Sequence, residues 1–289
     1  MFKKVAVFGL GLLGGSICRG LKKINADIRI SAFGRNPEKL EPALRDRVVD
    51  QAGGFDGMSL SGVELAVVSM PVEPSIDIIR RILSSPELDP GAIVIDVGSV
   101  KEKIVRSLDR IDRSDRFIGC HPMAGSEKMG YEHSRDDLFN GSSVIITPHA
   151  RNRESEVRTV RRFWESLKAL TVIISPEEHD LIMAYTSHLP HVVASSLVRV
   201  FYRFREERGD ADLSACIGKG FLDATRISSG SPDMWRDIVA LNRKNILAAL
   251  DRFIEELGTL RDVVSGAEAE MKPLHDYLSK AKSVRDGLK

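Results

Sequence analysis

Polar residues that could move a proton follow three apolar runs in the first half of the chain. They are Ser69-Met70-Pro71, residues 96–101 (DVGSVK) and residues 121–128 (HPMAGSEK). Ligands of open parallel sheets bind at the carboxyl ends of the strands, so we expect these segments to form one site. His121 is a candidate general base there, because imidazole titrates near neutral pH and oxidation of a carbinol requires removal of the hydroxyl proton. A histidine at a strand end can also be purely structural, and the residue type alone leaves both interpretations open.

A glycine-rich turn follows the first apolar run. Residues 9–14 read GLGLLG, the GxGxxG pattern of a dinucleotide-binding turn when a strand precedes it and a helix follows. Gly9 would permit the tight turn, Gly11 the close approach of a pyrophosphate, and Gly14 the packing of the helix on the strand. A glycine-rich connection that binds nothing is the alternative. The predicted cofactor-binding residues, taken from this turn and the neighbouring strand ends, are Gly9, Gly11, Leu12, Leu13, Gly14, Gly34, Arg35, Ser69, Met70, Pro71, Val97 and Gly98.

The end of the second predicted strand indicates which nicotinamide cofactor is preferred. An enzyme that binds NAD places Asp or Glu there, to accept a hydrogen bond from the ribose 2′-hydroxyl. Here residues 33–36 read FGRN, and Glu38 is the first acidic residue after them. A guanidinium can pair with a 2′-phosphate, so Arg35 favours NADP over NAD. The alternative is that Arg35 is a surface residue beside a turn.

Short β-branched runs alternate with helical patterns as far as residue 175, and such alternation predicts a parallel sheet with helices on both faces. From residue 176 onward the sequence has helical periods and almost no strand signal. We therefore predict an α/β protein with a Rossmann-type, doubly wound parallel sheet in residues 1–175 and an all-helical dimerisation domain in residues 176–289. The predicted strands are residues 4–9, 28–33, 65–70, 92–97, 116–120, 143–147 and 171–175.

Two segments of the second half have the patterns of packed helices. In residues 245–264, apolar side chains recur every three or four residues, which predicts one apolar helix face. Residues 191–201 (HVVASSLVRVF) are apolar nearly all round. We expect this second helix to be buried, and a second subunit is one way to bury it, so a homodimer is expected.

The composition is that of an ordinary globular protein. The 289 residues carry 42 basic and 41 acidic side chains, and a net charge of +1 attracts neither nucleic acid nor an anionic membrane. No run of about 18 or more apolar residues occurs, so no membrane span is expected. The three cysteines lie far apart and form neither a disulfide framework nor a zinc pattern, which favours a reducing compartment and a cytoplasmic location.

The helical half has two further segments that could bind a substrate. They are residues 187–191 (SHLPH) and residues 220–227 (GFLDATRI), with Trp235 a little further on. The two histidines of SHLPH have a spacing that could ligate a metal. However, Pro190 is expected to interrupt the helix and no glutamate of the HExxH type accompanies them, so we predict no metal site.

Together these segments resemble the prephenate/arogenate dehydrogenase family of tyrosine biosynthesis. The likeness covers essentially the whole chain and rests on GLGLLGGS, DVGSVK, HPMAGSEKMG, SHLPH, FLDATRI and a later MW. The resemblance implies oxidative decarboxylation of a cyclohexadienyl substrate, prephenate or arogenate. Hydride would leave C4 for the nicotinamide, the C4 hydroxyl would lose its proton, and the ring carboxylate would depart as carbon dioxide.

The resemblance also implies roles for individual residues. His121 would be the base on the C4 hydroxyl, and Ser99 would hydrogen-bond that hydroxyl and hold His121. Arg226 would bind a substrate carboxylate in the bidentate geometry that arginine offers. His191 would orient the substrate, Ser126 would contact it, and Trp235 would close the pocket. Glu127 and Asp223 would form an ionic gate with Arg226. The other implied substrate-binding residues are Ser187 and His188 of SHLPH.

The sequence departs from the family pattern in two places. Met129 stands where many members carry a small residue, so we expect the loop after His121 to pack differently. The chain ends at Lys289 without the regulatory domain or the fused mutase domain that some members append. We therefore expect no allosteric control by tyrosine through such a domain, although tyrosine could compete at the active site.

Two other functions remain open at this point. Another NADP-dependent oxidoreductase, of the 3-hydroxyacid or imino-acid type, would share the glycine turn. The hydroxyacid enzymes place asparagine four residues after a catalytic lysine, whereas Lys244 and Asn245 are adjacent. A non-catalytic redox sensor that binds NADP would need neither His121 nor Arg226.

Overall fold

The computed structural model describes residues 2–124, 130–209, 212–266 and 271–288. The chain divides into two compact units, Met1–Asn242 and Arg243–Lys289. The first unit contains a β-sheet with its covering helices and a further group of helices. The second unit contains two helices.

Eight strands form one sheet in the first unit, in the order β3-β2-β1-β4-β5-β6-β7-β8. β1 lies between β2 and β4 and is parallel to both, with Val7 opposite Ala32 and Val67. The order reverses on the two sides of β1, as in a doubly wound sheet. The strands are β1 Lys4–Phe8, β2 Arg29–Gly34, β3 Gln51–Gly54, β4 Leu65–Val68, β5 Ile93–Asp96, β6 Phe117–Pro122, β7 Ser143–Thr147 and β8 Leu170–Ile173.

The sheet differs from the sequence prediction in two respects. β7 is antiparallel to β6 and parallel to β8, so the doubly wound sheet is parallel as predicted except where β6 pairs with β7. Parallel neighbours need a crossover, usually a helix, and the described part of the connection between β6 and β7 contains only a single 3-10 turn, Tyr131–His133. β3 was not predicted, because its sequence, QAGG, has none of the β-branched residues that mark the other strands.

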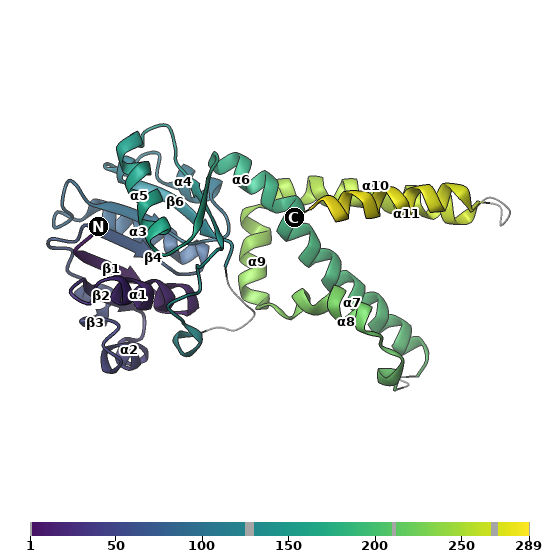
Figure 1. Cartoon of the computed structure of the whole chain (residues 1–289), viewed down its shortest axis with the longest axis horizontal. Coiled ribbons are helices and arrows are strands. Elements are labelled where there is room, and N and C mark those ends of the chain that lie inside the picture. Colours follow the sequence, from purple (N-terminus) through teal and green to yellow (C-terminus); the bar gives the residue numbers. More distant parts are fainter. Residues whose placement is uncertain (1, 125–129, 210–211, 267–270, 289) are drawn as a thin grey trace. The chain divides into compact units, whose positions relative to one another are not determined.

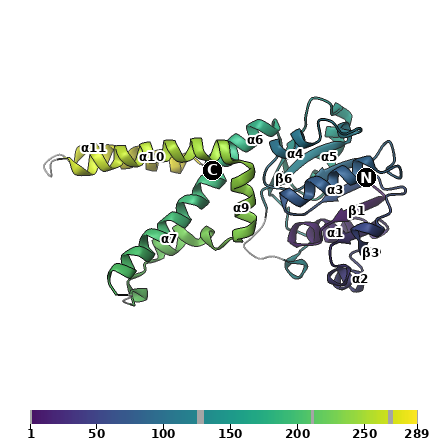
Figure 2. The same ribbon diagram turned by 180° about the vertical axis from the view of Figure 1, so that it is seen from behind.

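Helices cover both faces of the sheet, which Figures 1 and 2 show from opposite sides. Alternate residues of β1 enter different cores: Val5 and Val7 join one core with residues of α1 and α5, and Ala6 and Phe8 join the other with residues of α3 and α4. The helices of the first unit are α1 Leu12–Ile24, α2 Glu41–Arg45, α3 Val72–Ser84, α4 Glu102–Ser107, α5 Glu154–Ser166, α6 Pro176–Met183, α7 Leu189–Glu207, α8 Lys219–Thr225 and α9 Pro232–Leu241.

A continuous helical stretch joins α6 to α7. The five residues between them, Ala184–His188, form a π-helical turn. Pro190 is the second residue of α7, which follows this turn directly. The α-helix is therefore interrupted just before Pro190 by the π-helical turn, but the chain stays helical on both sides of it, so the proline does not end the helix. By length and composition alone, the whole stretch Pro176–Glu207 could cross a membrane, but its first half is anchored in the first unit by buried polar side chains such as His179.

The second unit consists of α10, Arg243–Ser265, and α11, Lys272–Gly287. Both views show the two helices side by side (Figures 1 and 2). α10 confirms the helix predicted for residues 245–264. Several large apolar side chains of the unit are exposed, among them Ile254, Val264 and Val284.

Candidate active site

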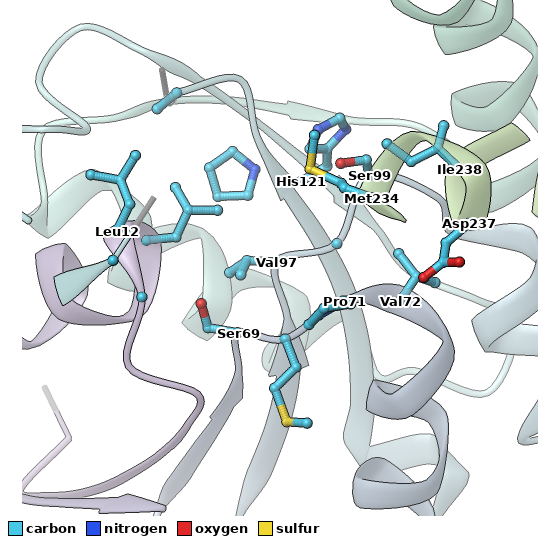
Figure 3. Close-up of a pocket in the computed structure, with 17 residues that line it drawn as sticks. Leu12, Ser69, Pro71, Val72, Val97, Ser99, His121, Met234, Asp237 and Ile238 are labelled. Atoms are coloured by element: carbon cyan, nitrogen blue, oxygen red, sulfur yellow. The ribbon is translucent and has the colours of Figure 1, made fainter. Parts of the chain in front are cut away.

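A cavity of about 390 Å³ opens at the edge of the sheet where β1, β4, β5 and β6 end. The three strand-end segments singled out in the sequence meet here, together with the glycine turn and one side of α9. In Figure 3, Leu12 of the glycine turn lies on one side of the cavity, and Asp237 and Ile238 of α9 lie on the other. The lining residues are Gly11, Leu12, Leu13, Ser69, Met70, Pro71, Val72, Val97, Gly98, Ser99, His121, Pro122, Ala124, Gly130, Met234, Asp237 and Ile238.

The glycine turn has the shape that a diphosphate requires. Gly9 has φ +91°, and a Cβ there would lie 2.3 Å from the carbonyl oxygen of Ser69. A Cβ on Gly14 would lie 2.2 Å from the carbonyl oxygen of Gly9, so the helix can approach the strand only without one. Gly11 lines the cavity, and a Cβ there would meet nothing within 4 Å. The N-terminus of α1 is therefore accessible from the cavity, where helix N–H groups favour an anion, and the residues present fit a dinucleotide.

Gly34 and Arg35 lie at the same edge of the sheet, outside the cavity. The amide of Gly9 donates to the carbonyl of Phe33 at 2.8 Å, which holds the end of β2 against the glycine turn. Gly34 is the buried last residue of β2, and Arg35, which follows it, is exposed. Arg35 is thus placed beyond the turn, where the adenosine ribose of a dinucleotide would lie.

His121 is partly buried near the end of β6. Its Nδ1 lies 2.8 Å from Nε2 of His179, which belongs to α6. Burial holds the pKa of His121 well below its ordinary value, and the neighbouring His179 and the charge of Lys101 lower this pKa further. The imidazole is therefore neutral at pH 7, the form that a general base needs.

A buried ion pair supports the site from inside the sheet. Lys101 and Asp96 are 0% and 1% exposed and pair through Nζ and Oδ2. Nζ of Lys101 also donates to the carbonyl of Cys120 at 2.8 Å, and Oδ2 of Asp96 accepts from the amide of Gly98 at 2.9 Å. These bonds join the end of β5, the loop that carries Ser99 and the residue before His121.

His188, His191 and Trp235 form an aromatic group beside α9. The rings of His191 and Trp235 are stacked, with centroids 3.5 Å apart and an angle of 9°. His188 is buried, and its Nδ1 lies 3.1 Å from Nδ2 of Asn242. Burial lowers the pKa of His188 to about 4. None of the three rings lines the cavity itself, but Met234, the neighbour of Trp235, does.

The remaining predicted substrate-binding residues that the structure describes are more exposed to solvent than His188 and His191. Arg226 and Asp223 are exposed, and Asp223 pairs with Lys219 at 3.2 Å. Ser187 is half-buried in the π-helical turn. Ser126, Glu127 and Met129 lie outside the described residues.

The structure adds residues to the site that the sequence did not indicate. His179, Asp180 and Asn242 are buried, and Asn242 donates to the carbonyl of Asp180 at 2.7 Å. Nothing in their local sequence marks them, because they reach His121 and His188 only through the packing of α6 and α9. Among the described residues, no group of three or more His, Cys, Asp or Glu is arranged to hold a metal ion.

A doubly wound sheet, a glycine turn at a helix N-terminus and a neutral histidine in the same cavity define an oxidoreductase of the dinucleotide-binding class. Comparison with family models narrows this class. Residues 17–173 match the nucleotide-binding domain of prephenate dehydrogenase, and residues 175–280 match its dimerization domain. The chain belongs to the prephenate dehydrogenase family and is an oxidoreductase.

Individual relatives agree with this assignment. The chain is 35% identical to the prephenate dehydrogenase of Bacillus subtilis (strain 168), over 98% of this chain and 76% of the relative. It is 28% identical to the cyclohexadienyl dehydrogenase of Zymomonas mobilis, over 100% and 97% of the two chains.

Two solved structures are similar along their whole length. The prephenate dehydrogenase of Aquifex aeolicus in complex with hydroxyphenyl propionate and NAD+ has a TM-score of 0.86 and 32% identity, with 100% of this chain and 99% of the other covered. The arogenate dehydrogenase of Synechocystis has a TM-score of 0.82 and 25% identity, with 99% and 100% covered.

Proposed function

We propose that the protein catalyses the oxidative decarboxylation of prephenate or arogenate, with hydride transfer to NADP, as a step of tyrosine biosynthesis. The observation that carries this proposal is the cavity that His121 and Ser99 share with the glycine turn. A nicotinamide dinucleotide bound at the turn would accept the hydride. The proposal rests also on the relatives that are prephenate, cyclohexadienyl and arogenate dehydrogenases.

In this reaction His121 would accept the proton of the C4 hydroxyl while the hydride leaves C4. The ring carbonyl that forms can then take the electron pair of the breaking bond to the carboxylate, which releases carbon dioxide. The product is a phenolate, and the imidazolium of His121 can return the proton to it. Ser99, beside the same cavity, would hydrogen-bond the hydroxyl and hold it in place.

The helical residues would bind the rest of the substrate. Among the described residues, the buried atoms Nε2 of His188 and Nδ1 of His191 have no hydrogen-bond partner. Buried polar atoms usually have one, and a polar substrate could supply it. We propose Arg226 as the partner of a substrate carboxylate, Trp235 as the residue that closes the pocket, and Ser126, Ser187, Glu127 and Asp223 as further substrate contacts.

The reaction can be followed by the absorbance of the reduced cofactor. With NADP we expect turnover of prephenate, arogenate or both, and none of a 3-hydroxyacid or a cyclic imino acid. Comparison of kcat/KM for prephenate and arogenate identifies the substrate. Turnover of the hydroxyacid or imino acid alone would favour the other oxidoreductases, and binding of NADP with no turnover of any of them would favour a redox sensor.

Arg35 is expected to determine the choice of cofactor. A charge-assisted bond to a 2′-phosphate contributes about 1.5–3 kcal/mol, so Arg35→Ala should lower the affinity for NADP by about 10- to 150-fold and change NAD use little. The measurement is kcat/KM for both cofactors in the wild type and the variant. Arg47→Ala, which removes an exposed arginine from the turn after α2, is the matched control. A wild-type preference for NAD, or an unchanged ratio in Arg35→Ala, would show that Arg35 does not recognise a phosphate.

We also propose that the protein is a homodimer whose helical part, residues 176–289, follows a cofactor domain, residues 1–175. The supporting observation is α7, where only His191 and Ala194 are buried although residues 191–201 are apolar nearly all round. The single chain thus leaves most of this helix uncovered, and a second subunit remains as the way to bury it. Leu197, Val200 and Phe204 are 40%, 65% and 44% exposed, a surface that a partner would cover.

Light scattering at micromolar concentration is expected to give twice the chain mass of 32.0 kDa. Val200→Asp should shift the protein toward the monomer, because a charge would be placed in the buried interface. Arg162→Asp, on the exposed side of α5, should leave the dimer intact. A wild-type monomer at this concentration would contradict the proposal.

Two further proposals concern the setting of the enzyme. The cysteines Cys18, Cys120 and Cys216 are free thiols, as expected in a reducing compartment, and we propose a cytoplasmic location.

Tyrosine, which resembles the aromatic product, is proposed as a competitive inhibitor at the active site.

A further inference from the structure

The imidazole of His121 is one end of a buried hydrogen-bonded chain. Its Nδ1 lies 2.8 Å from Nε2 of His179, and Nδ1 of His179 lies 2.7 Å from Oδ1 of Asp180. His179 and Asp180 are 0% and 1% exposed. The chain therefore runs from the cavity, where His121 is accessible, to a carboxylate that solvent does not reach.

Backbone amides fix the carboxylate of Asp180. Oδ1 accepts from the amide of Lys101 at 2.8 Å, and Oδ2 accepts from the amide of Glu102 at 3.0 Å, where α4 begins. A carboxylate has acceptor positions only. The proton between Asp180 and His179 therefore lies on Nδ1 of His179.

This assignment determines the protons of both imidazoles. A neutral His179 with its proton on Nδ1 has an Nε2 that can only accept, so Nδ1 of His121 must donate to it. The Nε2 of His121 is then unprotonated and is the atom left to act in the cavity. A base oriented through its second nitrogen by a buried carboxylate is a recurring arrangement in catalysis.

We propose that His179 and Asp180 are positioning residues, which hold His121 in the tautomer whose Nε2 can accept the substrate proton and which stabilise the imidazolium after the transfer. This inference rests on the proposed function, in which His121 is the base. The hydroxyl proton moves to Nε2 of His121, while the proton on Nδ1 stays shared with His179. Of the three hydrogen-bonded side chains His121, His179 and Asp180, only Asp180 carries a full negative charge.

Other titratable groups face His121 as well. Lys101, after β5, and His188, in the π-helical turn, disfavour its protonation, and burial has the same effect. Asp96 is already paired with Lys101. Burial lowers the pKa of His179, and Asp180 opposes this effect. His179 is hydrogen-bonded to His121, so removal of the charge of Asp180 should also make the imidazolium of His121 less stable.

Asp180→Asn is the first test, in the full-length enzyme with prephenate and the preferred cofactor. The amide has one oxygen and one NH2 group, so it cannot accept from Lys101, Glu102 and His179 together as the carboxylate does. The proton on Nδ1 of His179 is then no longer fixed, and the tautomer of His121 with an unprotonated Nε2 is no longer selected. We expect kcat to fall by roughly 10- to 10³-fold, within the contribution of general-base catalysis, with little change in KM. The acid limb of the remaining activity should move to lower pH, because the charge that stabilises the imidazolium is gone. Glu177→Gln removes an exposed acid of the same helix and should change neither quantity.

An unchanged kcat in Asp180→Asn, or a lower kcat with the acid limb in its wild-type position, would overturn the proposal, since the second result is what a purely structural role predicts. Nitrogen NMR of the wild-type imidazoles provides a test that needs neither the Asp180→Asn variant nor turnover. His121, assigned by its absence from the spectrum of His121→Asn, should carry its proton on Nδ1 with Nε2 unprotonated. The opposite tautomer would disprove the arrangement even in an active enzyme, whereas absence of prephenate turnover would bear on the proposed function alone.

Discussion

Replacement of His121 by asparagine should lower kcat by roughly 10²- to 10⁴-fold, the usual contribution of a general acid or base, with a small effect on KM. Asparagine keeps a polar group at the cavity but cannot take the hydroxyl proton. His133→Asn, which changes an exposed histidine of the turn before β7, is the matched control and should retain wild-type activity.

The pH dependence of the wild type should report the same group. The base must be unprotonated, and burial with the charges around it holds the pKa of His121 well below its ordinary value. From the sequence alone, the acid limb of the pH profile is expected in the usual range of histidine. With this lowered pKa, the activity should persist to a lower pH than that range. Near-normal kcat in His121→Asn, with an unaltered acid limb, would assign a structural role to this histidine.

Replacement of Lys101 by methionine should destabilise the protein by about 3–5 kcal/mol, the usual cost of leaving one member of a buried ion pair without its partner. Asp96 would remain as an unpaired buried carboxylate, and the carbonyl of Cys120 would lose a donor. A loss of this size is a large part of the stability of a typical domain. Urea unfolding measured beside the wild type checks the prediction.

The control for this variant lies two residues further along the chain. Lys103 is exposed on α4, so Lys103→Met removes the same charge without leaving a buried carboxylate. We expect this change to alter the free energy of unfolding by no more than about 0.5 kcal/mol. Equal effects of the two substitutions would show that the buried pair contributes nothing particular to stability.

Local sequence signals were sufficient for much of the fold and for one wall of the site. The glycine turn could be predicted because Gly9 and Gly14 occupy positions that no other residue can fill, and this restriction is visible in the sequence. The parallel strands could be predicted because strands buried on both faces have short, continuously apolar sequences. The position of His121 followed from its place at the end of such a strand.

Features that depend on packing were not accessible in this way. The direction of β7 depends on the path of a connection with no helix in its described part, and β3 has no β-branched residue. His179 and Asp180 are separated from His121 by more than fifty residues of sequence. They meet it only when α6 packs against α4 and β6, a long-range arrangement that no local pattern encodes.

The helix α7 shows a different kind of limit. Its sequence predicts burial on all sides, but the first unit covers only His191, Ala194 and their immediate neighbourhood. An apolar pattern predicts that a helix surface will be covered. It does not indicate whether the same chain or a second copy of it provides the cover.

We propose that one cavity oxidises and decarboxylates a cyclohexadienyl substrate with His121 as the base. The most direct measurement is the amount of carbon dioxide released for each reduced cofactor formed, with prephenate or arogenate as the substrate and NADP as the oxidant. We expect equal amounts of the two, with an aromatic phenol as the product and both signals greatly reduced in His121→Asn. Reduced cofactor formed without carbon dioxide, or no reduction with either substrate and either cofactor, would contradict the proposal.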